Sequence, residues 1–126
     1  MELTGTPLAL KTEAWRAWLE ANHATADEAW VVISKKHSTA PSVTLAQATE
    51  EALCFGWIDS AMRPMDEERY ALRYTPRRKG SNWSERNKTR VARLIEQGRM
   101  TQAGLAAIEE AKRNGRWEGS GRPNGD

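Results

Sequence analysis

The sequence predicts an α+β fold in which a small antiparallel sheet of about three strands packs with four helices. Two observations support this class. Short segments rich in β-branched and aromatic residues occur in the first two thirds of the chain, and apolar residues at helical spacing fill the last third. The 126 residues suit a single domain, which we place at 1–117 and expect to be followed by a disordered tail at 118–126.

The first expected helix spans about residues 13–22, and Thr12 is its expected N-cap because a hydroxyl can satisfy a free amide at a helix start. Three apolar residues recur at i, i+3 and i+4 on its inner face: Trp15, Trp18 and Leu19. A strand is expected at 29–36, where tryptophan and β-branched residues dominate, and a loop follows at 37–42.

A second helix is expected between Thr44, as its N-cap, and Gly56, which suits the left-handed conformation that often ends a helix. The helical spacing places Glu50 and Glu51 on the solvent side. The inner side carries Ala48, Ala52 and Leu53.

A β-hairpin is expected to follow this helix. Its strands are 57–63 and 69–75, and the residues at 64–67 have the composition of a turn. Neighbouring residues of a strand face opposite sides of the sheet, so one face of the second strand carries Tyr70, Leu72 and Tyr74.

The last third of the chain is expected to be helical. One helix lies between its N-cap, Ser84, and Gly98, with an inner face of Val91, Leu94 and Ile95. The other lies between its N-cap, Thr101, and Gly115, with an inner face of Leu105, Ile108 and Ala111. We expect Trp117 to pack back against the domain.

Charge is distributed unevenly along the chain. Residues 63–99 contain 11 Lys and Arg against 5 Asp and Glu, whereas residues 1–62 contain 4 against 8. A basic segment of this kind either faces an anionic partner or forms a solvated surface. The sequence shows no apolar run of membrane-spanning length, no secretory signal and only one cysteine, so we expect a cytoplasmic protein with no membrane partner.

The segment from Pro76 to Asn87 is the most distinctive in the chain. Three consecutive cations, at 77–79, precede a Gly-Ser-Asn turn, and Ser84 then begins a helix. The first amides of a helix lack internal partners and carry the positive end of its dipole. The segment therefore predicts a site for an anion.

Asp59 is a candidate site carboxylate. Alternation along its strand places it on one face with Trp57, Ala61 and Arg63. In one interpretation it forms an ion pair with a neighbouring arginine such as Arg69 or Arg73. In the other it is a partly desolvated carboxylate that binds a ligand or acts as a base.

No metal or cofactor is expected. Cys54 lies in the last turn of its helix, where the dipole raises the pKa of a thiol, so we expect a buried apolar residue and not a nucleophile. The spacing of His23, His37 and Cys54 matches no metal motif, and the common phosphate-binding loops are absent. Of the six tryptophans, Trp57 and Trp83 neighbour polar residues, so each either stacks on a ligand or fills the edge of the core.

Several motifs occur in a fixed order along residues 10–117. They are Trp15-x-x-Trp18-Leu19-x-x-Asn22-His23, the segment from Ala52 to Ser60, Tyr74-Thr75-Pro76-Arg77-Arg78, Ser81-Asn82-Trp83-Ser84-x-x-Asn87, Gly98-Arg99-Met100 and Gly104-Leu105. This order resembles the N-terminal region of the bacterial YdeI/OmpD-associated family, also called the bacteriocin-protection family. Members usually continue beyond a Gly-x-Trp motif, here Gly115-Arg116-Trp117, into a helical region rich in Arg and Lys. The resemblance implies that the polar residues of 57–60 and 77–87 are shared features.

Together these observations predict a cleft where the hairpin meets the basic loop. Its expected lining is Trp57, Asp59, Ser60, Arg77, Arg78, Ser81, Asn82, Trp83, Ser84 and Asn87. The main hypothesis is a module that binds an anionic small molecule or a nucleotide-like ligand. One alternative is a small enzyme in which Asp59 is the general base. The other is a nucleic-acid-binding module that uses the basic 63–99 face, with Trp83 stacking on bases and Arg86, Arg90 and Arg93 on phosphates.

Overall fold

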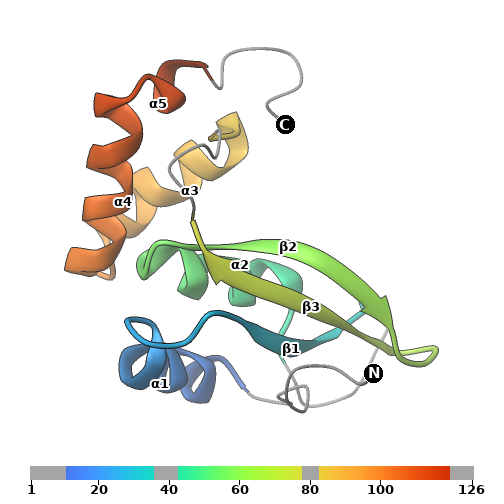
Figure 1. The fold of residues 1–126 in the computed structure, drawn as a ribbon. Coiled ribbons are helices and arrows are strands. Elements are labelled where there is room, and N and C mark those ends of the chain that lie inside the picture. The colour runs from blue at the N-terminus through green and yellow to red at the C-terminus, as the bar shows by residue number, and fades with distance from the viewer. Residues whose placement is uncertain (1–10, 36–42, 78–82, 120–126) are drawn as a thin grey trace.

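The computed structural model describes residues 11–35, 43–77 and 83–119, and its α+β arrangement confirms the predicted class (Figure 1). The elements, in chain order, are α1 (Thr12–Asn22), β1 (Ala29–Ser34), α2 (Leu45–Cys54), β2 (Trp57–Pro64), β3 (Arg69–Pro76), α3 (Glu85–Glu96), α4 (Gln102–Arg113) and the short α5 (Arg116–Gly119). Of the expected tail at 118–126, the first two residues belong to α5, and the remainder lies outside the described residues.

The sheet has three antiparallel strands in the order β1-β3-β2, and β2 and β3 form the predicted hairpin. Its central strand pairs with both neighbours: Leu72 lies opposite Val31 of β1 and Met62 of β2. Figure 1 shows α3, α4 and α5 at the end of the sheet where β2 begins and β3 ends. The hairpin turn between β2 and β3 lies at the opposite end of the sheet from these helices.

The core lies between one face of the sheet and the helices. The sheet contributes alternate residues to it, among them Val31, Ile33, Leu72 and Tyr74. From α1 come Trp15 and Leu19, and the indole of Trp15 donates a hydrogen bond to the carbonyl of Ala48 in α2 (3.0 Å). This bond satisfies the polar atom of a fully buried ring. In the part of the chain that the structure describes, no helix combines the length and apolar character that a membrane span requires.

The start of α1 differs from the prediction. Lys11 is the N-cap residue, and no side chain caps this helix. Thr12 is already helical, because the extended backbone ends one residue earlier than expected. The expected caps of the later helices are confirmed: Thr44 forms a capping box with Gln47, Ser84 accepts from the amide of Asn87, and Thr101 accepts from the amide of Gly104.

Glu51 was expected on the solvent side of α2, but it is only 4% exposed. Its carboxylate accepts hydrogen bonds from Arg16 of α1 (2.9 Å) and from Arg99, between α3 and α4 (2.7 Å). Arg16 also donates to the carbonyl oxygen of Arg99 (3.0 Å). The two guanidinium groups make burial of this charge tolerable, which helical spacing within α2 alone does not reveal.

Two apolar residues that were expected in the core are exposed. Ile95 of α3 and Leu105 of α4 both face solvent, whereas Val91, Leu94, Ile108 and Ala111 are buried as predicted. Each helix packs along a stripe narrower than the sequence pattern suggested. Trp117 of α5 packs against the core through the ring of Trp83, with centroids 5.2 Å apart, as expected.

α4 approaches the end of α2 unusually closely at Gly104. A Cβ atom at this position would lie 2.4 Å from the carbonyl oxygen of Cys54 and 2.4 Å from the sulfur of Met100. The same Cys54 oxygen accepts hydrogen bonds from the amide of Thr101 (3.1 Å) and from its hydroxyl (2.5 Å). The absence of a side chain at Gly104 thus allows α4 to satisfy a carbonyl at the C-terminus of α2.

We predict that Glu51→Gln destabilises the domain by about 2 kcal/mol, because hydrogen bonds to charged groups contribute about 1.5–3 kcal/mol and two arginines lose their partner. Urea denaturation at pH 7 measures this change. Glu50→Gln is the control: Glu50 is its more exposed neighbour and pairs at longer distances, 3.3 Å to Arg93 and 3.6 Å to Arg99. It should cost about 0–1 kcal/mol. Equal costs for the two variants would contradict the prediction.

We also predict that Gly104→Ala lowers the free energy of unfolding by about 1–3 kcal/mol. Alanine has the higher helix propensity, by about 1 kcal/mol, but a contact with a backbone oxygen can be relieved only by moving α4 away from α2. Thermal denaturation monitored by circular dichroism measures the change. Ala106→Ser, on the exposed side of α4, should be nearly neutral. A Gly104→Ala variant as stable as the parent would show that this contact relaxes freely.

Candidate functional site

A polar hollow of about 250 Å³ lies where α2, β2 and α3 meet. Its lining consists of Leu45 and Thr49 from α2, Asp59 from β2, the cap residue Ser84, and Arg86, Asn87 and Arg90 from α3. Three of the residues expected in the cleft thus come together here: Asp59, Ser84 and Asn87. We refer to this feature as the α2–β2–α3 hollow.

Asp59 directly precedes a β-bulge in β2. The register of β2 against β3 passes from Asp59 opposite Tyr74 directly to Ala61 opposite Arg73, so Ser60 is an extra residue. Before the bulge, Asp59 lies on the same side as the buried Tyr74. After it, Arg63 lies on the other face of the sheet. The expectation that Asp59 and Arg63 share a face is therefore wrong, because one inserted residue reverses the alternation.

The arginines that were expected to pair with Asp59 are engaged elsewhere. Arg69 binds Asp66 (2.8 Å), and Arg73 binds Glu28 (2.6 Å). Arg63 lies over the ring of Trp30, 5.6 Å from its centroid. Within the described ranges, Asp59 forms no ion pair and accepts no hydrogen bond, so its carboxylate is exposed at the hollow with both oxygens available.

The first two turns of α3 supply the basic wall of the hollow. Ser84 is the N-cap, with its hydroxyl oxygen 3.1 Å from the amide nitrogen of Asn87. Arg86 and Arg90 are four residues apart and therefore neighbours on one side of the helix. The guanidinium of Arg90 donates to the amide oxygen of Asn87 (2.9 Å), which fixes its position.

Thr49, which lines the hollow, is paired with a second buried hydroxyl group. Thr49 of α2 and Tyr74 of β3 lie 2.9 Å apart at their oxygens. Burial raises the pKa of Tyr74 far above its ordinary value, and the hydrogen bond from Thr49 only partly offsets this effect. Tyr74 therefore stays protonated at all physiological pH values and acts as a structural hydroxyl bonded to Thr49.

Two expected ligand-stacking residues are buried. Trp57 and Trp83 are each 1% exposed, so neither ring lines the hollow or is accessible to a ligand in this structure. Trp57 meets the ring of Trp18 edge to face, and the guanidinium of Arg77 lies over Trp83 at 3.8 Å from its centroid. These rings fill the edge of the core, which was the other interpretation of their position.

Arg77 is half-buried and does not line the hollow. Its backbone amide donates to the carbonyl of Gly56 (2.9 Å), and burial lowers the pKa of its guanidinium to about 10, although the charge of Asp59 raises it. Arg77 is thus still cationic at neutral pH, but its guanidinium packs over the ring of Trp83. Ser60 lies by Arg73 instead, whose guanidinium donates to its hydroxyl (3.2 Å). Arg78, Ser81 and Asn82 lie outside the described residues.

Four of the described lining residues were not predicted for this site. Leu45 and Thr49 were regarded as parts of a helix, while Arg86 and Arg90 entered only as members of a nucleic-acid surface. The spacing from Ser84 could have identified two of them, because residues two, three and six positions after an N-cap lie in the first two turns of the helix. Their approach to Asp59 depends on tertiary packing.

Cys54 is fully buried, and burial raises the pKa of its thiol. Among the residues that the structure describes, no three His, Cys, Asp or Glu side chains are grouped closely enough to hold a metal ion. The raising effect of burial on the Cys54 thiol outweighs the lowering effect of the nearby Arg16.

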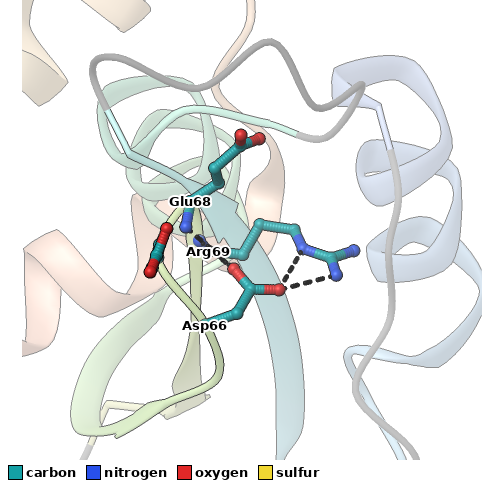
Figure 2. A pocket seen from close by; sticks show the side chains of 4 residues that line it. Asp66, Glu68 and Arg69 are labelled. Carbon is teal, nitrogen blue, oxygen red and sulfur yellow. Dashed lines mark hydrogen bonds and ion pairs between the residues drawn. The ribbon is translucent and has the colours of Figure 1, made fainter.

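A second hollow, of about 480 Å³, lies beside the hairpin turn, where its described lining is Asp66, Glu67, Glu68 and Arg69. Figure 2 shows that Asp66 and Arg69 satisfy each other: both oxygens of Asp66 accept from Arg69, at 2.8 Å from its amide and 2.8 Å from its guanidinium. The hydrogen bond from Arg69 lowers the pKa of Asp66. The arrangement closes a turn, and its described side chains leave no free cation for an anion to bind.

The fold and the α2–β2–α3 hollow define a small α+β domain with a charged, ligand-sized depression. A profile of the family described as a domain of unknown function (DUF8412) matches residues 8–107, and the chain belongs to this family. The matched stretch contains every residue that lines the hollow. No curated protein and no solved structure matches the chain.

We predict that Ser84→Ala destabilises the domain by about 0.5–2 kcal/mol through the loss of the N-cap of α3. Urea denaturation measures the change. Thr89→Ala on the same helix is the control, because Thr89 is exposed and only donates back to the carbonyl of Glu85 (3.1 Å). That variant should be neutral or slightly stabilising. If both variants unfold at the parent midpoint, the cap contributes nothing to stability.

Proposed function

We propose that this domain binds a small anionic ligand in the α2–β2–α3 hollow. The observation that supports this proposal most strongly is which arginines already have a carboxylate or a ring as a partner. Most described arginines are engaged with carboxylates or rings: Arg16, Arg63, Arg69, Arg73, Arg77, Arg93, Arg99 and Arg113. Arg86 and Arg90 form no ion pair with any carboxylate in the described ranges, and both line the hollow.

An anion in the hollow would complete the hydrogen bonding of these two groups. A guanidinium presents a planar set of N–H donors that matches a carboxylate or a phosphate. The amides and positive dipole end of α3 add to the same potential. Two arginines against one aspartate also leave the described lining with a net positive charge.

The burial of two tryptophans reduces the range of ligands that the structure supports. A nucleotide-like ligand was expected partly because Trp57 and Trp83 neighbour the polar motifs, yet both rings are covered. Support for base stacking is therefore lost, and the support that remains is for the anionic group. The same reasoning weakens the nucleic-acid alternative, in which Trp83 stacks on bases.

We predict that the double variant Arg86→Gln/Arg90→Gln binds inorganic phosphate or pyrophosphate at least about tenfold more weakly than the parent, since each charge-assisted hydrogen bond contributes about 1.5–3 kcal/mol. Isothermal titration calorimetry at low ionic strength measures the dissociation constant. The fold should be unaffected, because both side chains lie at the surface of α3.

The matched control is Arg93→Gln/Arg113→Gln, which removes the same charge from exposed positions away from the hollow. It should bind like the parent. Equal weakening in both double variants would mean that the anion responds only to net charge and would contradict a specific site. A shallow dependence of affinity on salt is expected for one anion, whereas a steep one would favour a nucleic-acid surface.

Two further expectations from the sequence are part of this proposal. The order of its motifs supports a relationship to the YdeI/OmpD-associated family and to bacterial proteins. The composition, with one buried cysteine, supports a cytoplasmic location, where an anionic metabolite would be the natural partner.

A further inference from the structure

We propose that the α2–β2–α3 hollow selects anions that also carry hydroxyl groups, so that its ligand class is a small sugar phosphate or a similar hydroxylated phosphate. This inference rests on the proposed function, because Arg86 and Arg90 must first bind the anionic group. What it adds is a role for Asp59, which a simple anion site would not contain.

Asp59 is the acidic residue of the described lining. It comes from β2 and lies in the same hollow as two arginines of α3, yet neither arginine forms an ion pair with it among the described contacts. Neither guanidinium thus lies within ion-pair distance of the Asp59 carboxylate. Asp59 lies on the side of the sheet that carries the buried Tyr74, and the bulge at Ser60 places Arg63 on the opposite face, away from the hollow.

An ionised carboxylate only accepts hydrogen bonds, and it repels other anions. The end of a ligand that meets Asp59 must therefore be uncharged or cationic, and must carry O–H or N–H donors. Asn87 extends the same selection: its amide oxygen already accepts from Arg90 (2.9 Å), so its NH₂ group is left to donate to a ligand oxygen. Donors and acceptors in this order match phosphate at one end of a ligand and hydroxyl groups at the other.

The size of the hollow sets an upper limit on the ligand. At about 250 Å³ it is smaller than the roughly 300–1,000 Å³ of pockets that hold drug-sized molecules and nucleotide cofactors. A dinucleotide does not fit within it. A pentose or triose phosphate has the right scale, and its hydroxyl groups lie several bonds from the phosphate.

The experiment compares two probes with the same phosphate group: ribose 5-phosphate, which has hydroxyl donors, and n-butyl phosphate, which has none. Calorimetry is carried out on the parent and on Asp59→Ala. The parent should bind ribose 5-phosphate at least about tenfold more tightly than butyl phosphate, and in Asp59→Ala the ratio should fall to within about threefold. Asp27→Ala, which removes an equally exposed carboxylate outside the hollow, should keep the parent ratio.

The possible results separate the two proposals. If the parent binds both probes equally, the inference about hydroxyl groups fails while the anion site stands. If the preference persists in Asp59→Ala, the selection exists but Asp59 does not cause it, and this inference is overturned. If neither probe binds to the parent, both proposals fail. In the expected case, Arg86→Gln/Arg90→Gln weakens both probes by a similar factor and leaves their ratio unchanged.

Discussion

The carboxylate of Glu51 is the point on which the arrangement of the helices depends. It joins Arg16 of α1 to Arg99 of the α3–α4 connection, across 35 and 48 residues of chain. The adjacent end of α2 is fixed by Thr101, which satisfies the carbonyl of Cys54. The connection that leaves α3 is thus held against α1 and α2. These contacts help to position α2 and α3 relative to each other, and both helices line the α2–β2–α3 hollow.

The hollow itself combines two devices that act on different scales. A cap and a regular helix place Ser84, Asn87 and Arg90 by local geometry, which short-range sequence rules describe well. A bulge directly after Asp59 breaks the alternation of β2, so that Asp59 and Arg63 lie on opposite faces of the sheet. The result is a polar depression whose opposing charges are supplied by separate elements and do not neutralise each other in the described structure.

This difference explains how much of the molecule could be predicted from its sequence. The fold class, the hairpin and the caps at Thr44, Ser84 and Thr101 depend on neighbouring residues, and all are confirmed. The burial of Glu51 depends on arginines far away in the sequence, so helical spacing alone assigned it wrongly. The same limitation applies to the site. Ser84, Asn87 and Asp59 were recognised as polar motif residues, whereas Thr49 and Arg90 become part of the hollow only through the packing of α2 against α3.

The bulge has a further consequence for the open side of the sheet. β2 is an edge strand, and most of it is exposed, including Met62 at 62%. A long, regular edge of this kind offers a row of unpaired backbone groups to any passing strand, which makes it a starting point for aggregation. The extra residue at Ser60 interrupts that row, and Pro64 removes one donor from its end. The irregularity that separates Asp59 from Arg63 therefore also protects the domain against growth of its own sheet.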